Sequence, residues 1–194
     1  MNKILVVPTE KYKIFSFYPN DSFEEFLNTN GLYLDRPYAE TDPDFLQIIP
    51  YVVVHRNNKE IFAYTRLKKG NESRLHGNIS VGIGGHVQKI EGVSPFQNYI
   101  DYINIELKEE LDISNFNSLS LLAPNNPIYI YDTSNEVGKV HLGIVFTLDV
   151  GTEKVSINET DKIEGKFYSL EELFTLHDRY ENWTKIALKG LYNI

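Results

Sequence analysis

Residues 105–113 read Ile105-Glu106-Leu107-Lys108-Glu109-Glu110-Leu111-Asp112-Ile113, and a glycine-rich run, Gly84-Gly85-His86-Val87, precedes them. Helical residues advance by about 100° each, so Glu106, Glu109 and Glu110 fall on one arc of roughly 100°. Carboxylates this close on an exposed helix repel one another by about a few tenths of a kcal/mol per pair. Carboxylate oxygens are also the ligands that Mg²⁺ and Mn²⁺ prefer. The pattern alone fits a solvated acidic face or a metal-binding face, and its surroundings decide between the two.

The acidic turn belongs to a helix that we expect to run from Ser94 to about Leu111. Serine favours the N-cap position and Pro95 the first helical position. An apolar stripe at helical spacing follows, made of Phe96, Ile100, Ile103, Leu107 and Leu111. The three glutamates lie beside this stripe rather than opposite it.

Apolar runs predict strands on both sides of this helix. Residues 51–54 and 61–65 flank Asn57-Asn58, which is typical of a hairpin. Further expected strands cover residues 4–7, 79–87, 128–131, 141–150 and 167–168, and further helices begin after Ser22, after Ser169 and near Glu181. Residues 35–44, with two prolines, are expected to form a surface linker. This order of elements predicts an α/β fold.

Two features of the expected elements bear on organisation and function. The glycines of residues 79–87 predict a backbone that another group approaches closely, because glycine otherwise weakens a strand. We expect residues 1–46 to form an N-terminal strand-and-helix extension packed on the core, and residues 47–194 to form the main domain.

Composition excludes several classes of protein. The formal net charge of −8 argues against a nucleic-acid scaffold, which needs clustered Lys and Arg. No apolar run approaches the roughly 20 residues that cross a membrane. The chain has no cysteine, which excludes disulfides, thiolate catalysis and Cys-based zinc sites. We expect a cytoplasmic protein, and a short strand at the N-terminus would support a homodimer.

The segment that begins at Gly85 resembles the Nudix box, G-x5-E-x7-R-E-U-x-E-E-x-G-U, in which U is a bulky aliphatic residue. Gly85 and Glu91 match the first glycine and the first glutamate. The second half is matched by Glu106, Leu107, Glu109, Glu110 and Ile113. The resemblance spans roughly residues 40 to 190 and is to a bacterial branch of the Nudix superfamily known only as predicted phosphoesterases.

The chain departs from the box at three points. Thirteen residues, rather than seven, separate Glu91 from Ile105. Counted from Pro95, the helix gains about one turn, which preserves its face. The box arginine, which orients a metal-binding glutamate in the family, is Ile105 here. The box glycine is Asp112, and glycine there suits a left-handed helix end that Asp adopts at some cost.

The resemblance implies a Nudix-type α/β/α sandwich with a mixed sheet, in which the catalytic helix follows a glycine-rich strand. It implies hydrolysis of a diphosphate linkage in a nucleoside diphosphate-linked or related small molecule, with Mg²⁺ or Mn²⁺ as cofactor. Glu106, Glu109 and Glu110 would hold the metal and serve catalysis, and the carbonyl of Gly85 would complete the metal shell. The metal lowers the pKa of a bound water, which then attacks phosphorus.

Other site residues are candidates by position. Glu164, or else Glu136, would be the general base, although both also fit solvated surface acids. Arg66, Lys68 and Arg74 surround the loop before the glycine-rich strand and would contact substrate phosphates, although a solvated basic loop explains them equally well. His76 and His86 are expected to hydrogen-bond within the sheet, since Mg²⁺ prefers oxygen ligands.

Two functional interpretations remain open. The chain is a metal-dependent pyrophosphohydrolase acting on a small phosphorylated substrate, or a Nudix-fold nucleotide-binding or regulatory module with weakened catalysis. The glutamates favour the first, whereas Ile105 and Asp112 favour the second. An isoprenoid-diphosphate isomerase is set aside because that enzyme type uses a catalytic cysteine. The sequence does not identify the substrate, the general base or the number of metal ions.

Overall fold

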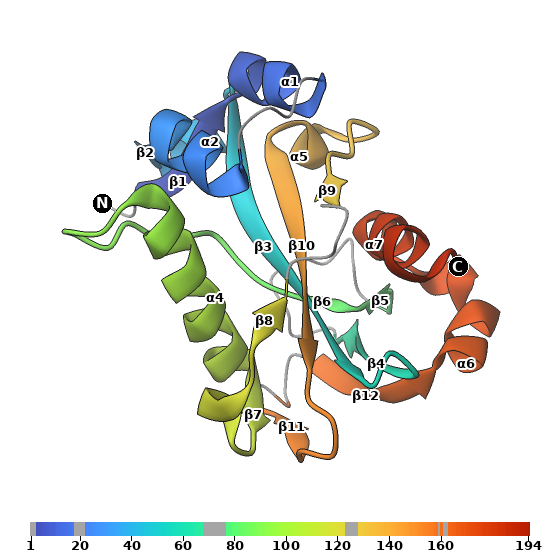
Figure 1. The fold of residues 1–194 in the computed structure, drawn as a ribbon. Coiled ribbons are helices and arrows are strands. Elements are labelled where there is room, and N and C mark those ends of the chain that lie inside the picture. Colours follow the sequence, from blue (N-terminus) through green and yellow to red (C-terminus); the bar gives the residue numbers. More distant parts are fainter. Residues whose placement is uncertain (1–2, 18–21, 68–76, 123–127, 159, 161–162) are drawn as a thin grey trace. The chain divides into compact units, whose positions relative to one another are not determined.

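The computed structural model describes residues 3–17, 22–67, 77–122, 128–158, 160 and 163–194 (Figure 1). The described helices are α1 (Thr9–Phe17), α2 (Phe23–Asn30), α3 (Arg36–Ala39), α4 (Pro95–Glu110), α5 (Glu136–Lys139), α6 (Leu170–Thr175) and α7 (Asn182–Tyr192), with 3₁₀ helices at Phe116–Ser118 and His177–Arg179. The described strands are β1 (Lys3–Pro8), β2 (Leu32–Asp35), β3 (Phe45–Arg56), β4 (Glu60–Arg66), β5 (Ile79–Ser80), β6 (Gly82–Ile83), β7 (Leu111–Ile113), β8 (Leu121–Leu122), β9 (Tyr129–Ile130), β10 (His141–Asp149), β11 (Val155–Ile157) and β12 (Ile163–Ser169).

The chain divides into two compact units. The first comprises residues 1–50, 85–104 and 131–144, and the second comprises residues 51–84, 105–130 and 145–194. Each of β3, α4 and β10 contributes residues to both units. The predicted boundary between residues 46 and 47 stays a prediction.

The first unit is built around β1, whose side chains from Ile4 to Val7 are all fully buried. This strand pairs antiparallel with β2 on one side and with the first residues of β3 on the other. Helix α2 is capped by the Ser22 hydroxyl, as the sequence predicted, and buries Phe26. In the first part of α4, Tyr99 is fully buried against Phe23, with ring centroids 5.6 Å apart.

The expected linker over residues 35–44 is only partly correct, because it contains the short helix α3. Pro37 stands in the first turn of that helix, where its missing N–H costs nothing. Ala39 is fully buried against Ile4 and Val6, and its carbonyl accepts a hydrogen bond from Gln47 Nε2. Burial of Ala39 therefore holds residues 35–44 against the core, although the prolines and acidic residues of this segment predicted a surface linker.

The second unit begins with the predicted hairpin between β3 and β4. Three residues join these strands, and the first two, Asn57 and Asn58, are left-handed, with φ values of 50° and 55°. Asparagine adopts this conformation more readily than most residues, which favours a turn here. β4 pairs antiparallel with β12 along its whole length, from Ile163 opposite Arg66 to Ser169 opposite Glu60. The hairpin prediction is confirmed.

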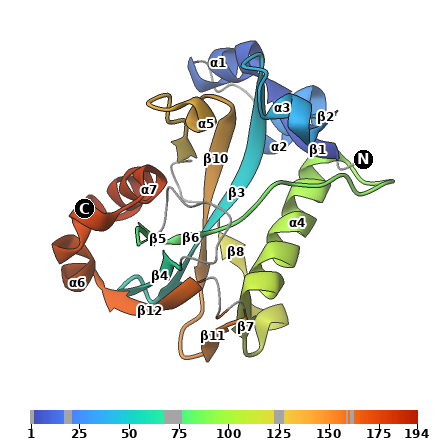
Figure 2. The same cartoon turned by 180° about the vertical axis from the view of Figure 1, so that it is seen from behind.

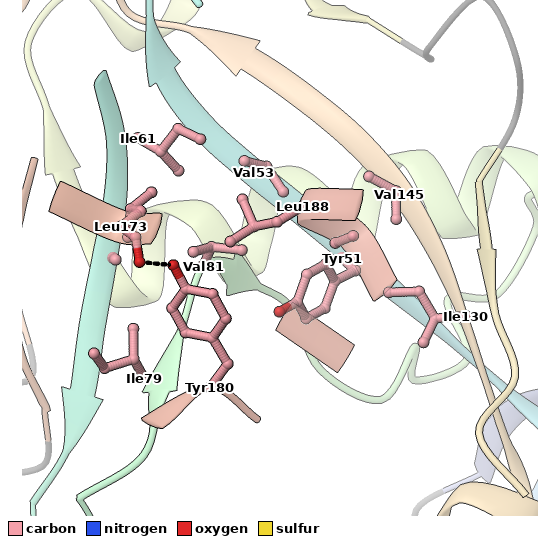
Figure 3. Close-up of a cluster of buried hydrophobic side chains, with 12 residues drawn as sticks. Tyr51, Val53, Ile61, Ile79, Val81, Ile130, Val145, Leu173, Tyr180 and Leu188 are labelled. Atoms are coloured by element: carbon pink, nitrogen blue, oxygen red, sulfur yellow. Dashed lines mark hydrogen bonds between the residues drawn. The ribbon is translucent and has the colours of Figure 1, made fainter. Parts of the chain in front are cut away.

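Helices α6 and α7 lie together beside the strands of the second unit (Figure 1 and Figure 2). The predicted capping box at the start of α6 is present, because the Ser169 and Glu172 side chains each accept from the other residue's backbone N–H. Figure 3 shows the core that these helices share with the strands, including the Tyr180 hydroxyl donating to the Leu173 carbonyl. The buried members of this core are Tyr51, Val53, Ile61, Ala63, Ile79, Val81, Ile130, Val145, Leu173, Tyr180, Ala187 and Leu188.

The expected single strand over residues 79–87 is instead two short strands, β5 and β6. Between them, the Val81 backbone N–H donates to the Thr184 hydroxyl of α7 at 3.3 Å instead of to a neighbouring strand. The same hydroxyl donates to the Ile79 carbonyl at 3.2 Å and lies 3.1 Å from the Tyr51 hydroxyl. A buried polar contact with a helix more than 100 residues later in the chain thus interrupts the strand.

The close approach expected at these glycines occurs at Gly82, and the approaching group is a core side chain. A Cβ atom built on Gly82 would lie 2.2 Å from the buried ring of Tyr51. That ring is fixed by hydrogen bonds to Ser80 and Thr184 and has no room to withdraw. Glycine at this position is therefore required by packing.

We expect Gly82→Ala to lower the free energy of unfolding by about 3 kcal/mol, because overpacking a rigid ring displaces it from its partners. Denaturant unfolding measures this. Gly77→Ala is the control: Gly77 has a φ of 80°, but a Cβ added there would meet nothing within 4 Å. Gly77→Ala should therefore lower the free energy of unfolding only by the roughly 1–2 kcal/mol that a left-handed backbone costs a residue with a Cβ atom. Equal stability of the two variants would show that the Tyr51 ring does not impose the requirement.

Candidate metal and catalytic site

The acidic turn ends α4, and the chain passes directly from Glu110 into β7. Strand β7 pairs antiparallel with β11, with Asp112 opposite Ser156. Asp112, at the position of the box glycine, is therefore extended and bears no left-handed cost, contrary to the expectation from sequence. The left-handed residue is Asn115, with a φ of 53°.

Asn158, which follows β11, holds the last turn of α4. The final carbonyls of a helix lack partners within the helix. Asn158 satisfies two of them: its side-chain amide donates to the Lys108 carbonyl and its backbone N–H to the Glu110 carbonyl, both at 3.0 Å. The turn that carries Glu109 and Glu110 is therefore fixed to the end of β11.

The three glutamates border the buried stripe of α4, as predicted. Leu107 is fully buried and Leu111 nearly so. Glu106 and Glu110 are half-buried, and Glu109 is exposed. Within the described ranges, no group of three or more His, Asp or Glu side chains converges as a metal cluster. The glutamates nevertheless supply an all-oxygen donor set on a surface arc, which fits a hard divalent cation.

The helix itself disfavours negative charge at this end. The C-terminus of a helix carries about half a negative elementary charge, and a like charge there costs roughly 0.3–1 kcal/mol. Lys108 is the basic residue of the last turn, and its ammonium lies 5.2 Å from the centroid of the Phe116 ring. Like charges on one helical arc and at a helix C-terminus are unfavourable, and a cation bound at Glu106, Glu109 and Glu110 would offset this cost.

Gly85, His86 and Val87 of the glycine-rich run belong to the first unit, where β1 pairs with Val87. The Leu5 N–H donates to the Val87 carbonyl at 2.8 Å, and the Asn98 side chain of α4 donates to the Gln88 carbonyl at 3.0 Å. Glu91 points into solvent and forms a 2.7 Å ion pair with Lys89. The role predicted for the Gly85 carbonyl as a metal ligand stays a prediction.

The remaining predicted residues lie on several elements. Glu164 is exposed on β12 opposite Thr65, and Glu136 is paired with Lys139 at 2.5 Å on α5. The backbone of Arg66 ends β4. Lys68 and Arg74 lie outside the described residues. The assignments of Glu164 as base and of Arg66, Lys68 and Arg74 as phosphate contacts stay predictions.

The sequence predicted that His86 hydrogen-bonds within the sheet but did not identify its partner, His141, the first residue of β10. His76 lies outside the described residues. The Nε2 atoms of His86 and His141 lie 3.2 Å apart, and His141 Nδ1 lies 2.6 Å from the Val137 carbonyl. Burial, with smaller contributions from the charges of Arg36 and His141, lowers the pKa of His86 to about 3. No local pattern joins residues 55 positions apart, so only the fold reveals the pair.

Comparison with known proteins identifies the fold family. No family model matches the chain. Protein YmaB of Bacillus subtilis (strain 168) is 38% identical over 154 residues, which are 77% of this chain and 73% of YmaB. The crystal structure of Tm1382, described as a candidate Nudix hydrolase, is 29% identical, covers 98% of both chains and superposes with a TM-score of 0.78. The chain belongs to the Nudix hydrolase superfamily.

The predicted Nudix-type α/β fold with a mixed sheet is thus confirmed. A more distant structure shares this Nudix fold: a bifunctional NMN adenylyltransferase/ADP ribose pyrophosphatase from Francisella tularensis, complexed with AMP and a Mn ion. It is 16% identical, covers 76% of this chain and 41% of its own, and has a TM-score of 0.51. Among the described residues of the Nudix chain, no helix is long and apolar enough to span a membrane.

Ile105 is 37% exposed, so an arginine can occupy this position without being buried. At helical spacing it would reach Glu109 one turn later. We expect Ile105→Arg to orient that glutamate and to reduce, by about tenfold, the Mn²⁺ concentration that half-maximally raises the melting temperature.

Ile105→Met is the matched control, since it keeps an apolar side chain of similar size and should respond to Mn²⁺ as the unmodified protein does. If Ile105→Arg folds normally but needs as much Mn²⁺ as Ile105→Met, the missing arginine does not explain metal affinity.

Proposed function

We propose that this Nudix chain hydrolyses the diphosphate linkage of a nucleoside diphosphate-linked or related small molecule, with Mg²⁺ or Mn²⁺ as cofactor. The observation that carries the proposal is the acidic turn of α4: Glu106, Glu109 and Glu110 share one arc, and Asn158 fixes the backbone of that turn. Membership in a superfamily of hydrolases supports hydrolysis, and carboxylate oxygens on one helical arc support a divalent metal as its cofactor.

Each group in the proposed site has a physical role. A bound divalent ion would neutralise the diphosphate and lower the pKa of a coordinated water. The glutamates would hold that ion at the protein surface, where a substrate can reach it. Because the chain carries a formal net charge of −8, an anionic substrate would be repelled elsewhere and attracted where a cation reverses the local field.

The other assignments complete this proposal. The Gly85 carbonyl would contribute a further oxygen ligand, and Glu164 would accept the proton of the attacking water. Arg66, Lys68 and Arg74 would contact the substrate phosphates. A structure that shares the fold, the bifunctional Francisella tularensis protein, is itself complexed with AMP and a Mn ion.

One observation favours a second candidate function, a Nudix-fold nucleotide-binding or regulatory module with weakened catalysis. Ile105 occupies the place of the box arginine and offers no hydrogen bond to orient Glu109. A loosely oriented ligand would lower metal affinity and turnover, while leaving a nucleotide site intact. Metal-dependent turnover separates the two functions.

We expect Glu110→Gln to reduce hydrolysis by at least about a hundredfold, since the amide keeps the shape of the side chain but removes the ligand charge. Release of nucleoside monophosphate from a panel of nucleoside diphosphate derivatives, in Mg²⁺ and in Mn²⁺, measures turnover. The same variant should lose most of the rise in melting temperature that these ions give the unmodified protein over EDTA.

Glu171→Gln, which changes an exposed glutamate of α6, is the matched control and should keep both turnover and the metal response. Turnover of Glu110→Gln close to that of Glu171→Gln would contradict the proposed site. Metal stabilisation of the unmodified protein without turnover of any substrate would favour the binding module.

A further inference from the structure

We propose that His86 and His141 form a second metal site, for a transition-metal ion such as Zn²⁺, Ni²⁺ or Cu²⁺. The two imidazole rings meet edge to face, with centroids 5.3 Å apart and planes inclined by 72°. Their Nε2 atoms face each other at 3.2 Å. Both residues belong to the first unit, at the end of the glycine-rich run and at the start of β10.

The separation of the two nitrogens fits shared coordination. Two imidazole nitrogens bound about 2.0–2.1 Å from one tetrahedral ion lie roughly 3.3–3.4 Å apart. The observed 3.2 Å differs from this by only about 0.2 Å. An ion could therefore enter with a small rotation of the rings and no movement of the backbone.

The second nitrogen of His141 supports this arrangement. His141 Nδ1 lies 2.6 Å from the Val137 carbonyl, which can only accept, so Nδ1 carries the proton. In the neutral ring, Nε2 then presents its lone pair toward His86. Metal-binding histidines are usually oriented in this way, by donating their other N–H to a carbonyl or a carboxylate.

Without a metal, the two rings can share a direct hydrogen bond, in which His86 Nε2 donates to His141 Nε2. An ion would replace that proton, which moves to Nδ1 of His86, and both rings stay neutral. Arg36 is the permanent positive charge that acts on His86, and its guanidinium is paired with Glu40 at 2.8 Å. This ion pair offsets the repulsion that Arg36 would otherwise exert on a cation.

Ligand chemistry separates this site from the acidic turn. Imidazole nitrogen suits Zn²⁺, Ni²⁺ and Cu²⁺, whereas Mg²⁺ prefers carboxylate oxygen. With two protein ligands, the remaining coordination positions would hold water or an added ligand, so the ion would exchange readily. The bound ion would join the segment after β6 to the first residue of β10.

The test uses Zn²⁺ and Cu²⁺ alone, added to the full chain freed of metal by a chelator. Calorimetric titration of Zn²⁺ should show at least about tenfold weaker binding in His141→Gln, and in His86→Gln, than in the unmodified protein. His177→Gln, at an exposed histidine of the second unit, and Glu110→Gln should keep the site. Electron paramagnetic resonance of bound Cu²⁺ should show coupling to two imidazole nitrogens, reduced to one in either variant of the pair.

The melting curve of each variant without metal shows whether that variant folds. If either His86→Gln or His141→Gln fails to fold, the other variant still tests the proposal. The proposal is overturned if His141→Gln and His86→Gln bind Zn²⁺ as tightly as His177→Gln, or if bound Cu²⁺ shows no nitrogen coupling. A Zn²⁺ site lost in Glu110→Gln but kept in the histidine variants would place the ion at the acidic turn and also overturn the proposal.

Discussion

The site proposed at the end of α4 depends on one physical constraint, the unfavourable placing of like charges on a single arc of the helix. Glu106, Glu109 and Glu110 share an arc, and the last two stand in the turn where the helix end is itself negative. The apolar stripe behind them is buried, and Asn158 binds two carbonyls of the turn, so the helix cannot unwind to separate the charges without losing these contacts. In the proposed site, a divalent cation would reduce this repulsion and leave the packing unchanged.

The elements set by local chemistry were predictable from sequence. Ser94 and Pro95 begin α4, the left-handed pair Asn57 and Asn58 forms the hairpin turn, and the Ser169 capping box begins α6. In each case a few neighbouring residues satisfy the hydrogen bonds or dihedral angles of the element. The Nudix resemblance connected these local motifs into one fold over roughly residues 40 to 190, which spacing alone does not do.

The features that sequence missed depend on contacts between distant residues. The interruption between β5 and β6 follows from the Thr184 hydroxyl, and the requirement for Gly82 follows from the Tyr51 ring. Asp112 is extended because β11 pairs with β7, whereas the family pattern suggested a left-handed helix end. Among the glycines of residues 79–87, Gly82 is thus required by the packing of the Tyr51 ring in the core rather than by a ligand. The roles assigned to Gly85, Arg66 and Glu164 stay predictions. No local sequence pattern determines which metal, water or phosphate group each of them would contact.

The chemistry proposed for the acidic turn requires that water attack phosphorus. Hydrolysis of a nucleoside diphosphate derivative in ¹⁸O-labelled water, with Mg²⁺ or Mn²⁺ and mass analysis of both products, measures this directly. We expect one ¹⁸O atom in a phosphate of one product, no label in the organic group, and no reaction in the presence of EDTA. Label in the organic group, or cleavage that persists without a divalent metal, would contradict metal-dependent attack at phosphorus by this Nudix chain.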